Sequence, residues 1–138
     1  MIYLDSSALV KLIRDEPETP ALIAWLNDRA SVACVSSCLA EVEVARALRR
    51  HDPAALATMP AVMARVYRVE IDARIRARAA AYDDLLLPSL DAIHLATADV
   101  LISEGQPLDA LVAYDDRLLA AASARDWPTS KPGASEPG

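Results

Sequence analysis

Four short apolar runs, separated by stretches with a helical pattern, constrain the fold of this chain more than any other feature. The runs cover residues 2–4, 31–35, 67–71 and 110–114. Between them, apolar residues recur at the spacing of a helix face, and Ser, Asp, Gly and Pro residues mark the helix ends. Short buried strands that alternate with helices indicate a mostly parallel sheet covered by helices on both faces. We therefore expect an α/β fold.

The expected helices fill the intervals between the strands, with Ser36 or Ser37, Asp72 and Ser89 as N-caps of three of them. They cover approximately residues 8–14, 21–28, 38–50, 73–82, 89–103 and 117–125, with further helical material in 53–65. The 138 residues fit a single domain, which we place at residues 1–128. Residues 129–138 are rich in Pro, Ser and Gly, and we expect them to form a disordered tail.

The composition of the chain restricts its cellular setting. It has no run of about 18 apolar residues, and its first residues lack the basic and apolar regions of a signal peptide, so we expect a cytoplasmic protein that does not bind membranes. In a reducing compartment, Cys34 and Cys38 are expected to be small buried hydrophobic residues rather than a disulfide or a zinc site. The net charge of −6 does not favour nucleic-acid binding through bulk electrostatics.

Two of the expected strands lead directly into aspartates. Asp5 follows the first strand, and Asp115 and Asp116 follow the last one. Ligands of open α/β sheets bind just beyond the carboxyl ends of the strands. A carboxylate in an apolar setting costs free energy unless it is paired or coordinates an ion. These aspartates are therefore candidates for a binding site.

Two further acids lie on apolar faces of expected helices. Glu41 shares its face with apolar residues such as Leu48, whereas Glu43 shares its face with arginines. We therefore predict that Glu41 faces inward and that Glu43 lies on the solvated side. Asp91 lies on an apolar face together with His94, although an aspartate in a first turn can simply favour the helix dipole. His94 is expected at most to orient a neighbouring group.

Four acids together define a candidate site: Asp5, Glu41, Asp91 and Asp115. Carboxylates brought within about 4–6 Å of each other could not all stay ionised without a cation. Oxygen ligands select hard divalent ions, so the predicted cofactor is Mg²⁺ or Mn²⁺ rather than zinc. Metal coordination would explain why a carboxylate follows the first buried strand.

Four segments of the sequence resemble, in order and spacing, the signature segments of PIN domains. They are MIYLDSSALVKL, SSCLAEVEVARAL, LDAIHLATA and VAYDDRLLAAA. The resemblance extends to about residue 127. Within the PIN domains, the segments most resemble the VapC group, the ribonuclease toxins of bacterial VapBC toxin–antitoxin pairs. It implies a PIN-like three-layer sandwich, an acidic pocket at the strand ends, and RNA cleavage that depends on Mg²⁺ or Mn²⁺. The family usually has Thr two residues before its last aspartate, where this chain has Ala113.

The resemblance implies catalytic and metal-binding roles for the same four acids. The reaction would be metal-assisted phosphodiester hydrolysis, in which a water made acidic by the ion attacks phosphorus. Glu41 would ligate the ion through water or act as general base, and Ser6 or Ser7 would supply a supporting hydroxyl. His94 and Asp116 are further supporting candidates.

The resemblance also implies RNA and two kinds of protein partner. Arg46, Arg49 and Arg50 are candidate phosphate contacts, as are the arginines between residues 65 and 78, although an ordinary solvated surface explains them equally well. Family members commonly form homodimers and bind a VapB-like antitoxin that covers the active site. We expect these interfaces on the helix around residues 21–26 and on four apolar residues of the preceding helix: Ala8, Leu9, Leu12 and Ile13.

Two other functions stay open. A phosphatase of the haloacid-dehalogenase type would use Asp5 as nucleophile and Asp115 and Asp116 for Mg²⁺, but Ser7 stands where its second catalytic aspartate belongs, and Glu41 would have no role. A PIN fold could also serve as a catalytically silent binding module, although all four acids of the family are present. Within the nuclease hypothesis, transfer, ribosomal and messenger RNA are all open as substrates, and so is the number of ions.

Overall fold

The computed structural model describes residues 1–135 and contains a five-stranded sheet whose neighbouring strands are all parallel. The strand order is β3-β2-β1-β4-β5, so β1 is central, with β2 on one side and β4 on the other. This arrangement puts the topological switch point between β1 and β4, where open α/β sheets bind their ligands. The strands are β1 (Ile2–Leu4), β2 (Cys34–Ser37), β3 (Tyr67–Val69), β4 (Ala110–Val112) and β5 (Thr129–Ser130).

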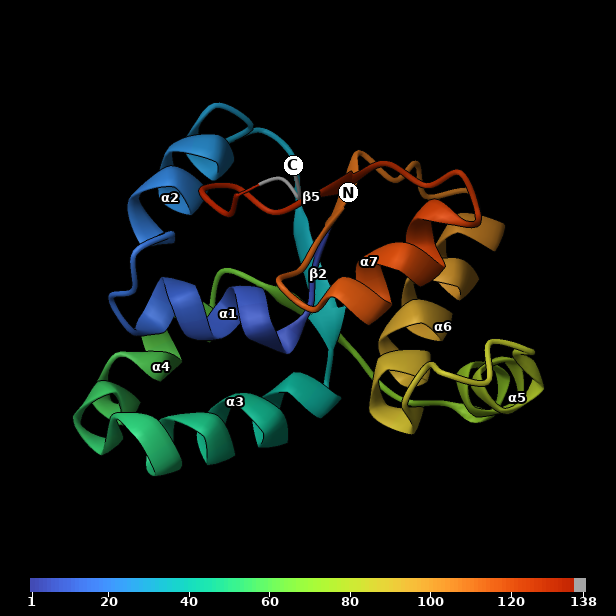
Figure 1. Ribbon diagram of the computed structural model, residues 1–138, viewed down its shortest axis with the longest axis horizontal. Helices are drawn as coiled ribbons and strands as arrows, with labels where there is room; N and C mark the ends of the chain where they lie inside the picture. The colour runs from blue at the N-terminus through green and yellow to red at the C-terminus, as the bar shows by residue number, and fades with distance from the viewer. Residues whose placement is uncertain (136–138) are drawn as a thin grey trace.

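The helices form one layer on each face of the sheet, which confirms the predicted α/β three-layer sandwich (Figure 1). One layer contains α1 (Ser6–Ile13), α2 (Thr19–Asn27), α3 (Leu39–His51), the 3₁₀ helix η1 (Pro53–Ala57) and α4 (Met59–Met63). The other layer contains α5 (Ala73–Ala81), α6 (Ser89–Ser103) and α7 (Asp116–Ser123). Within residues 1–135, no helix is long and apolar enough to cross a membrane.

Alternate side chains of the central strand point into the two helix layers, as the two-residue period of a strand requires. Ile2 and Leu4 pack in the core beneath α1 and α3, whereas Tyr3 packs on the opposite face beneath α6 and α7. All three side chains are fully buried. The end of β1, where Asp5 follows, is therefore anchored from both layers.

The second strand lies further along the chain than its apolar pattern predicted. It begins at Cys34 rather than at Ser31, and Ser36 and Ser37 pair with β3 instead of forming the start of a helix. The hydroxyl of Ser37 still accepts a hydrogen bond at 3.1 Å from the backbone N of Leu39, the first residue of α3, so this serine supports the helix start as predicted. Cys34 and Cys38 are free, half-buried thiols at either end of this strand.

The C-terminal segment is ordered through residue 135, contrary to the disordered tail expected from residue 129. Thr129 and Ser130 form β5 and pair in parallel with β4. Beyond β5, the hydroxyl of Tyr114 donates a hydrogen bond to the carbonyl of Pro132 at 2.7 Å, and Gly133 packs against α2. Backbone pairing, which composition does not reveal, holds the segment, so the expectation is wrong for residues 129–135. Residues 136–138 lie outside the described residues.

Candidate active site

Asp5 and Asp115 each cap the helix that follows their strand. Oδ1 of Asp5 accepts hydrogen bonds from the backbone N of Ala8 at 3.0 Å and from the hydroxyl of Ser7 at 2.6 Å. Oδ1 of Asp115 accepts from the backbone N of Arg117 at 2.9 Å. Capping therefore fixes both carboxylates at the carboxyl edge of the sheet. Within residues 1–135, Oδ2 of each aspartate accepts no hydrogen bond.

The hydroxyl of Ser7 joins the two capping turns. Besides donating to Asp5, it accepts a hydrogen bond from the backbone N of Tyr114 at 2.9 Å. Tyr114 directly precedes Asp115. One serine side chain thus holds the ends of β1 and β4 together and keeps the two aspartates in register.

Asp91, in the first turn of α6, completes a group that we call the acidic cluster: Asp5, Asp91 and Asp115. Burial, followed by the negative charges of Asp115 and Asp5, raises the pKa of Asp91 to about 6. Burial also raises the pKa of Asp5, which is 4% exposed, against the opposing effect of nearby His94 and the hydrogen bonds from Ser7 and Ala8. The charges of Asp115 and Asp5 thus disfavour the ionisation of Asp91, and a cation would relieve this repulsion.

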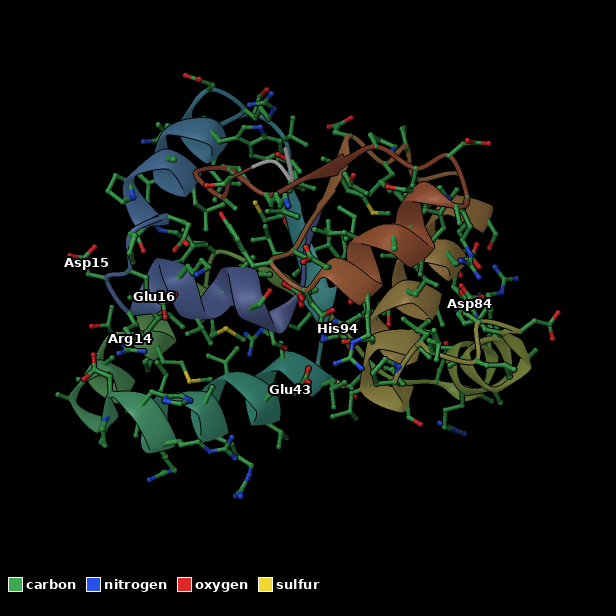
Figure 2. All side chains as sticks on the ribbon, viewed as in Figure 1. Arg14, Asp15, Glu16, Glu43, Asp84 and His94 are labelled. Atoms are coloured by element: carbon green, nitrogen blue, oxygen red, sulfur yellow. The ribbon has the colours of Figure 1, made fainter. Side chains whose placement is uncertain are left out.

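Glu43 of α3 contacts residues of two other helices, and Figure 2 shows it close to one of them, His94 of α6. Its Oε1 accepts a hydrogen bond from the hydroxyl of Ser6 at 2.7 Å and lies 2.7 Å from Nε2 of the buried His94. Burial disfavours the charge of Glu43, but the hydrogen bonds from His94 and Ser6 outweigh it and lower the pKa of this carboxyl. The charge of Glu43 in turn contributes to the raised pKa of Asp91. Glu43 therefore belongs with the clustered acids.

Glu41 lies elsewhere, which corrects the prediction made from helix faces. Its Oε1 forms an ion pair with Nη1 of Arg68 at 2.7 Å, and 50% of its side chain is exposed. Helical spacing tells where a residue lies around the axis of α3. It does not tell which other helix or strand packs beside that residue, because tertiary packing decides this. Arg68 of β3 lies beside Glu41, while α1 and α6 lie beside Glu43. Only these partners distinguish the two glutamates, and no local sequence signal does.

The remaining candidates lie in the core or at the surface. The side chain of Asp116 is 89% exposed and pairs with Lys131 at 3.8 Å. Ala113 is fully buried in the core beneath α6 and α7. Three exposed arginines of α3 form no ion pair with any residue of the described chain, so their charges are available to a partner: Arg46, Arg49 and Arg50.

The donor groups of the acidic cluster suit a hard divalent ion. Carboxylate oxygens are the preferred ligands of Mg²⁺ and Mn²⁺, and each aspartate of the cluster has at least one that accepts no hydrogen bond from residues 1–135. In this same part of the chain, no three acidic, histidine or cysteine side chains converge closely enough to form a preassembled metal site. The residues therefore fit a divalent ion by chemistry and charge, not by a preformed cage.

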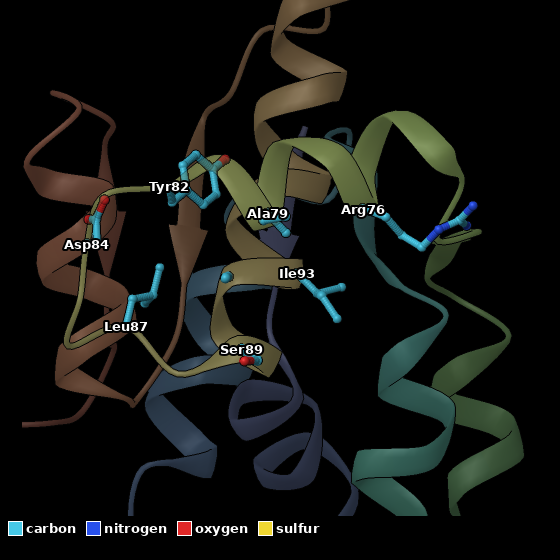
Figure 3. Close-up of a pocket in the computed structure, with 9 residues that line it drawn as sticks. Arg76, Ala79, Tyr82, Asp84, Leu87, Ser89 and Ile93 are labelled. Atoms are coloured by element: carbon cyan, nitrogen blue, oxygen red, sulfur yellow. The ribbon is translucent and has the colours of Figure 1, made fainter.

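A separate pocket of about 390 Å³ lies between α5 and the start of α6 (Figure 3). Its lining is mainly apolar and includes Tyr82, Leu87 and Ile93, with Arg76 and Asp84 as charged members. None of the acidic cluster lines it. The candidate active site is thus the edge of the sheet rather than this pocket.

The chain as a whole is similar to known proteins. The PIN domain family model matches residues 2–124. Ribonuclease VapC35 of Mycobacterium tuberculosis is 53% identical over 133 residues, which cover 96% of this chain and 98% of that protein. Ribonuclease VapC46 of the same organism is 43% identical over 121 residues, which cover 88% of this chain and 89% of that protein. The chain therefore belongs to the PIN domain family and, within it, to the VapC ribonucleases.

Two solved structures share the fold. The crystal structure of Mycobacterium tuberculosis VapC20, a Sarcin-Ricin loop cleaving toxin, has a TM-score of 0.66 at 21% identity and covers 88% of this chain and 95% of that chain. A chain of VapBC2 from Rickettsia felis, bound to a DNA fragment from its promoter, has a TM-score of 0.69 at 13% identity, with 94% and 98% covered. At such identities the similarity concerns the fold alone.

Proposed function

We propose that this chain is a cytoplasmic endoribonuclease toxin that cleaves RNA with the help of Mg²⁺ or Mn²⁺ and is neutralised by a VapB-like antitoxin. The proposal rests on the proximity of Asp5, Asp91 and Asp115 at the carboxyl edge of the sheet. Besides burial, the charge of Asp115 raises the pKa of both Asp5 and Asp91, and the charge of Asp5 raises the pKa of Asp91. Such repulsion is useful to a protein that binds a cation there. Membership of the VapC ribonucleases supports RNA as the substrate.

In this proposal the acidic cluster holds the ion, and Glu43 is the fourth acid of the site in place of Glu41. A divalent ion would supply Lewis acidity, which screens the phosphate and acidifies an attacking water. Glu43 is kept ionised by its two hydrogen bonds, so it is suited to accept a hydrogen bond from the attacking water and to orient it. Ser7 keeps Asp5 and the turn before Asp115 at a fixed separation.

Incubation of total RNA with the purified chain, freed of any co-purifying partner, tests this function. Reactions with Mg²⁺, with Mn²⁺ and with EDTA are compared, and Asp91→Asn is assayed beside the wild type. We expect discrete fragments that require the metal and are absent with Asp91→Asn, which removes a charge while keeping the size of the side chain. Intact RNA in every reaction, together with no Mn²⁺ binding by calorimetry, would overturn the proposal and favour a silent binding module.

We further propose that RNA phosphates lie along α3. Arg46 and Arg50 follow Glu43 by three and seven residues, which corresponds to about 4.5 and 10.5 Å along the helix axis. Each arginine that neutralises a phosphate should contribute about one released ion to the salt dependence of RNA binding. Arg46→Gln and Arg50→Gln should therefore weaken RNA binding and reduce the slope of log affinity against log salt concentration. Arg14→Gln, at the C-terminal end of α1, serves as control. An unchanged slope would show that α3 does not bind the backbone.

The antitoxin surface that we propose is an apolar groove of about 430 Å³ between α1, α2 and α4, lined in part by Leu12, Ile23 and Leu26. Ile23→Glu should abolish antitoxin binding and leave RNA cleavage intact. The homodimer stays a prediction, which light scattering on the purified chain would test. Three residues expected at these interfaces are instead buried in the core and cannot contribute: Ala8, Leu9 and Ile13.

A further inference from the structure

A line of hydrogen-bonded side chains runs from the middle of the sheet to Glu43. The hydroxyl of Tyr3 lies 2.8 Å from Nδ1 of His94, and Nε2 of His94 lies 2.7 Å from Oε1 of Glu43. Tyr3 of β1 is fully buried and His94 of α6 is 2% exposed. We call Tyr3, His94 and Glu43 the relay, because it connects the sheet, α6 and α3 through polar groups.

The direction of the hydrogen bond to Glu43 follows from what the two groups can donate. The ionised carboxylate of Glu43 only accepts, so Nε2 of His94 must carry a proton. Burial holds the pKa of the Tyr3 hydroxyl far above its usual value, so this hydroxyl keeps its proton. The hydroxyl lies 2.8 Å from Nδ1 of His94, and which of these two atoms donates depends on the tautomer of the ring. In either case this hydrogen bond holds the imidazole with Nε2 directed at Glu43.

The relay holds one carboxylate oxygen of Glu43 and leaves the other free. Oε1 receives hydrogen bonds from His94 and from the hydroxyl of Ser6, both at 2.7 Å. From residues 1–135, Oε2 receives none. Donors that hold one side of a carboxylate commonly orient it toward a metal site or a substrate.

We propose that Tyr3 and His94 are positioning residues, which keep the free oxygen of Glu43 directed at the acidic cluster. This inference rests on the proposed ribonuclease function. Tyr3 has no access to solvent, so it acts through His94 and not by contact with RNA. The alternative is that the relay only satisfies buried polar groups, in which case its loss would lower stability and leave the behaviour of Glu43 unchanged.

Substitutions along the relay test this role. We expect Tyr3→Phe and His94→Leu to lower kcat for RNA cleavage at least about tenfold, with KM changed less than about twofold. His94→Gln should restore part of the activity, because its amide can donate to Glu43 and accept from Tyr3. Tyr82→Phe is the matched control, since it also removes a phenol hydroxyl bound to a carboxylate, that of Asp99 at 2.8 Å. If Tyr3→Phe does not fold, the activities of His94→Gln and His94→Leu are compared instead, and equal activities would overturn the positioning role.

Mn²⁺ affinity, measured by calorimetry, gives a second readout that does not depend on turnover. Tyr3→Phe should weaken Mn²⁺ binding in the wild-type background but not in Glu43→Gln, because the relay acts through Glu43. If the losses of Mn²⁺ binding free energy caused by Tyr3→Phe and by Glu43→Gln were fully additive in the double variant, the inference would be overturned.

The remaining outcomes separate the two proposals. A wild type that cleaves RNA, with Tyr3→Phe equal to Tyr82→Phe in both readouts, would overturn the relay alone. A wild type that neither cleaves RNA nor binds Mn²⁺ would overturn the proposed function and the relay together.

Discussion

Glu41 and Arg68 form an ion pair of 2.7 Å that ties the first turn of α3 to the edge strand β3. Glu43, two residues further along the same helix, instead accepts hydrogen bonds from Ser6 of α1 and His94 of α6. Two glutamates of one helix turn therefore have different surroundings. One is neutralised at the surface, and the other is held beside the acidic cluster.

Glu41→Gln and Glu43→Gln form a matched pair, because they remove the same charge from the same turn. We expect Glu43→Gln to lower the rate of RNA cleavage by about 100-fold or more, since it removes the carboxylate proposed to orient the attacking water. Glu41→Gln should stay within about threefold of wild type, because an exposed ion pair contributes only about 0–1 kcal/mol to stability. Single-turnover cleavage of one RNA measures both. A larger loss in Glu41→Gln would return the catalytic role to Glu41.

Removal of the charge of Asp91 should stabilise the metal-free protein near neutral pH. The pKa of Asp91 in the folded chain is about 6, above its usual 3.8, so the folded chain binds this proton more tightly than the unfolded chain. The protonated carboxyl favours folding below the usual pKa, and this advantage is lost as the pH rises through 6. Because Asp91 is partly exposed, we expect Asp91→Asn to raise the free energy of unfolding in EDTA by about 1–2 kcal/mol at neutral pH.

Urea denaturation of wild type and Asp91→Asn at neutral pH and at about pH 4 measures this effect. The gain should nearly vanish at the lower pH, where the folded wild type already carries the proton. The same gain at both pH values would mean that the charge of Asp91 is not its source.

Asp84 and Arg125 should stabilise the loop between α5 and α6 in a pH-dependent way. Nη2 and Nη1 of Arg125 donate to the two carboxylate oxygens of Asp84 at 3.0 and 3.2 Å, and these hydrogen bonds lower the pKa of Asp84. The stabilisation is complete above the usual pKa and is lost as the pH falls through the lowered one. Asp84→Asn should cost about 0.5–1 kcal/mol at neutral pH. Urea denaturation should show the cost disappearing in strong acid, and a cost that persists there would contradict the assignment to charge.

Gly133 should tolerate substitution less well than Gly105. Both have positive φ, of +81° and +95°, so alanine strains either backbone by about 1 kcal/mol. Only at Gly133 would the new Cβ collide, at 2.9 Å from Cβ of Ala21 and 3.1 Å from Cα of Glu18, whereas Gly105 has open space. We expect Gly133→Ala to lower the melting temperature clearly more than Gly105→Ala. Equal shifts would show that the C-terminal segment does not pack on α2.

The sequence predicted those features that depend on local patterns. The short apolar run at residues 2–4 and the helices around it follow from periodicity, which the chain keeps in its folded state. Asp5 and Asp115 were identified as strand-end acids because the carboxyl ends of parallel strands meet at one edge. In the folded chain the charges of both aspartates raise the pKa of Asp91.

The features that the sequence did not predict depend on contacts between distant segments. The choice between Glu41 and Glu43 depends on which elements pack beside α3, and helical spacing does not contain this information. Thr129 and Ser130 form β5 through backbone pairing, although they carry no apolar pattern. Tyr3 would be assigned to the core by any local criterion, because its hydrogen-bond partner lies 91 residues away.

The hydrogen bond from the backbone of Tyr114 to Ser7 spans 107 residues and closes the site across β1 and β4. During translation, Asp5 leaves the ribosome early, but it cannot meet Asp115 until β4 has emerged and inserted beside β1. A nascent chain therefore carries an incomplete acidic cluster until β4 is in place. Any activity that needs this cluster can begin only after that insertion.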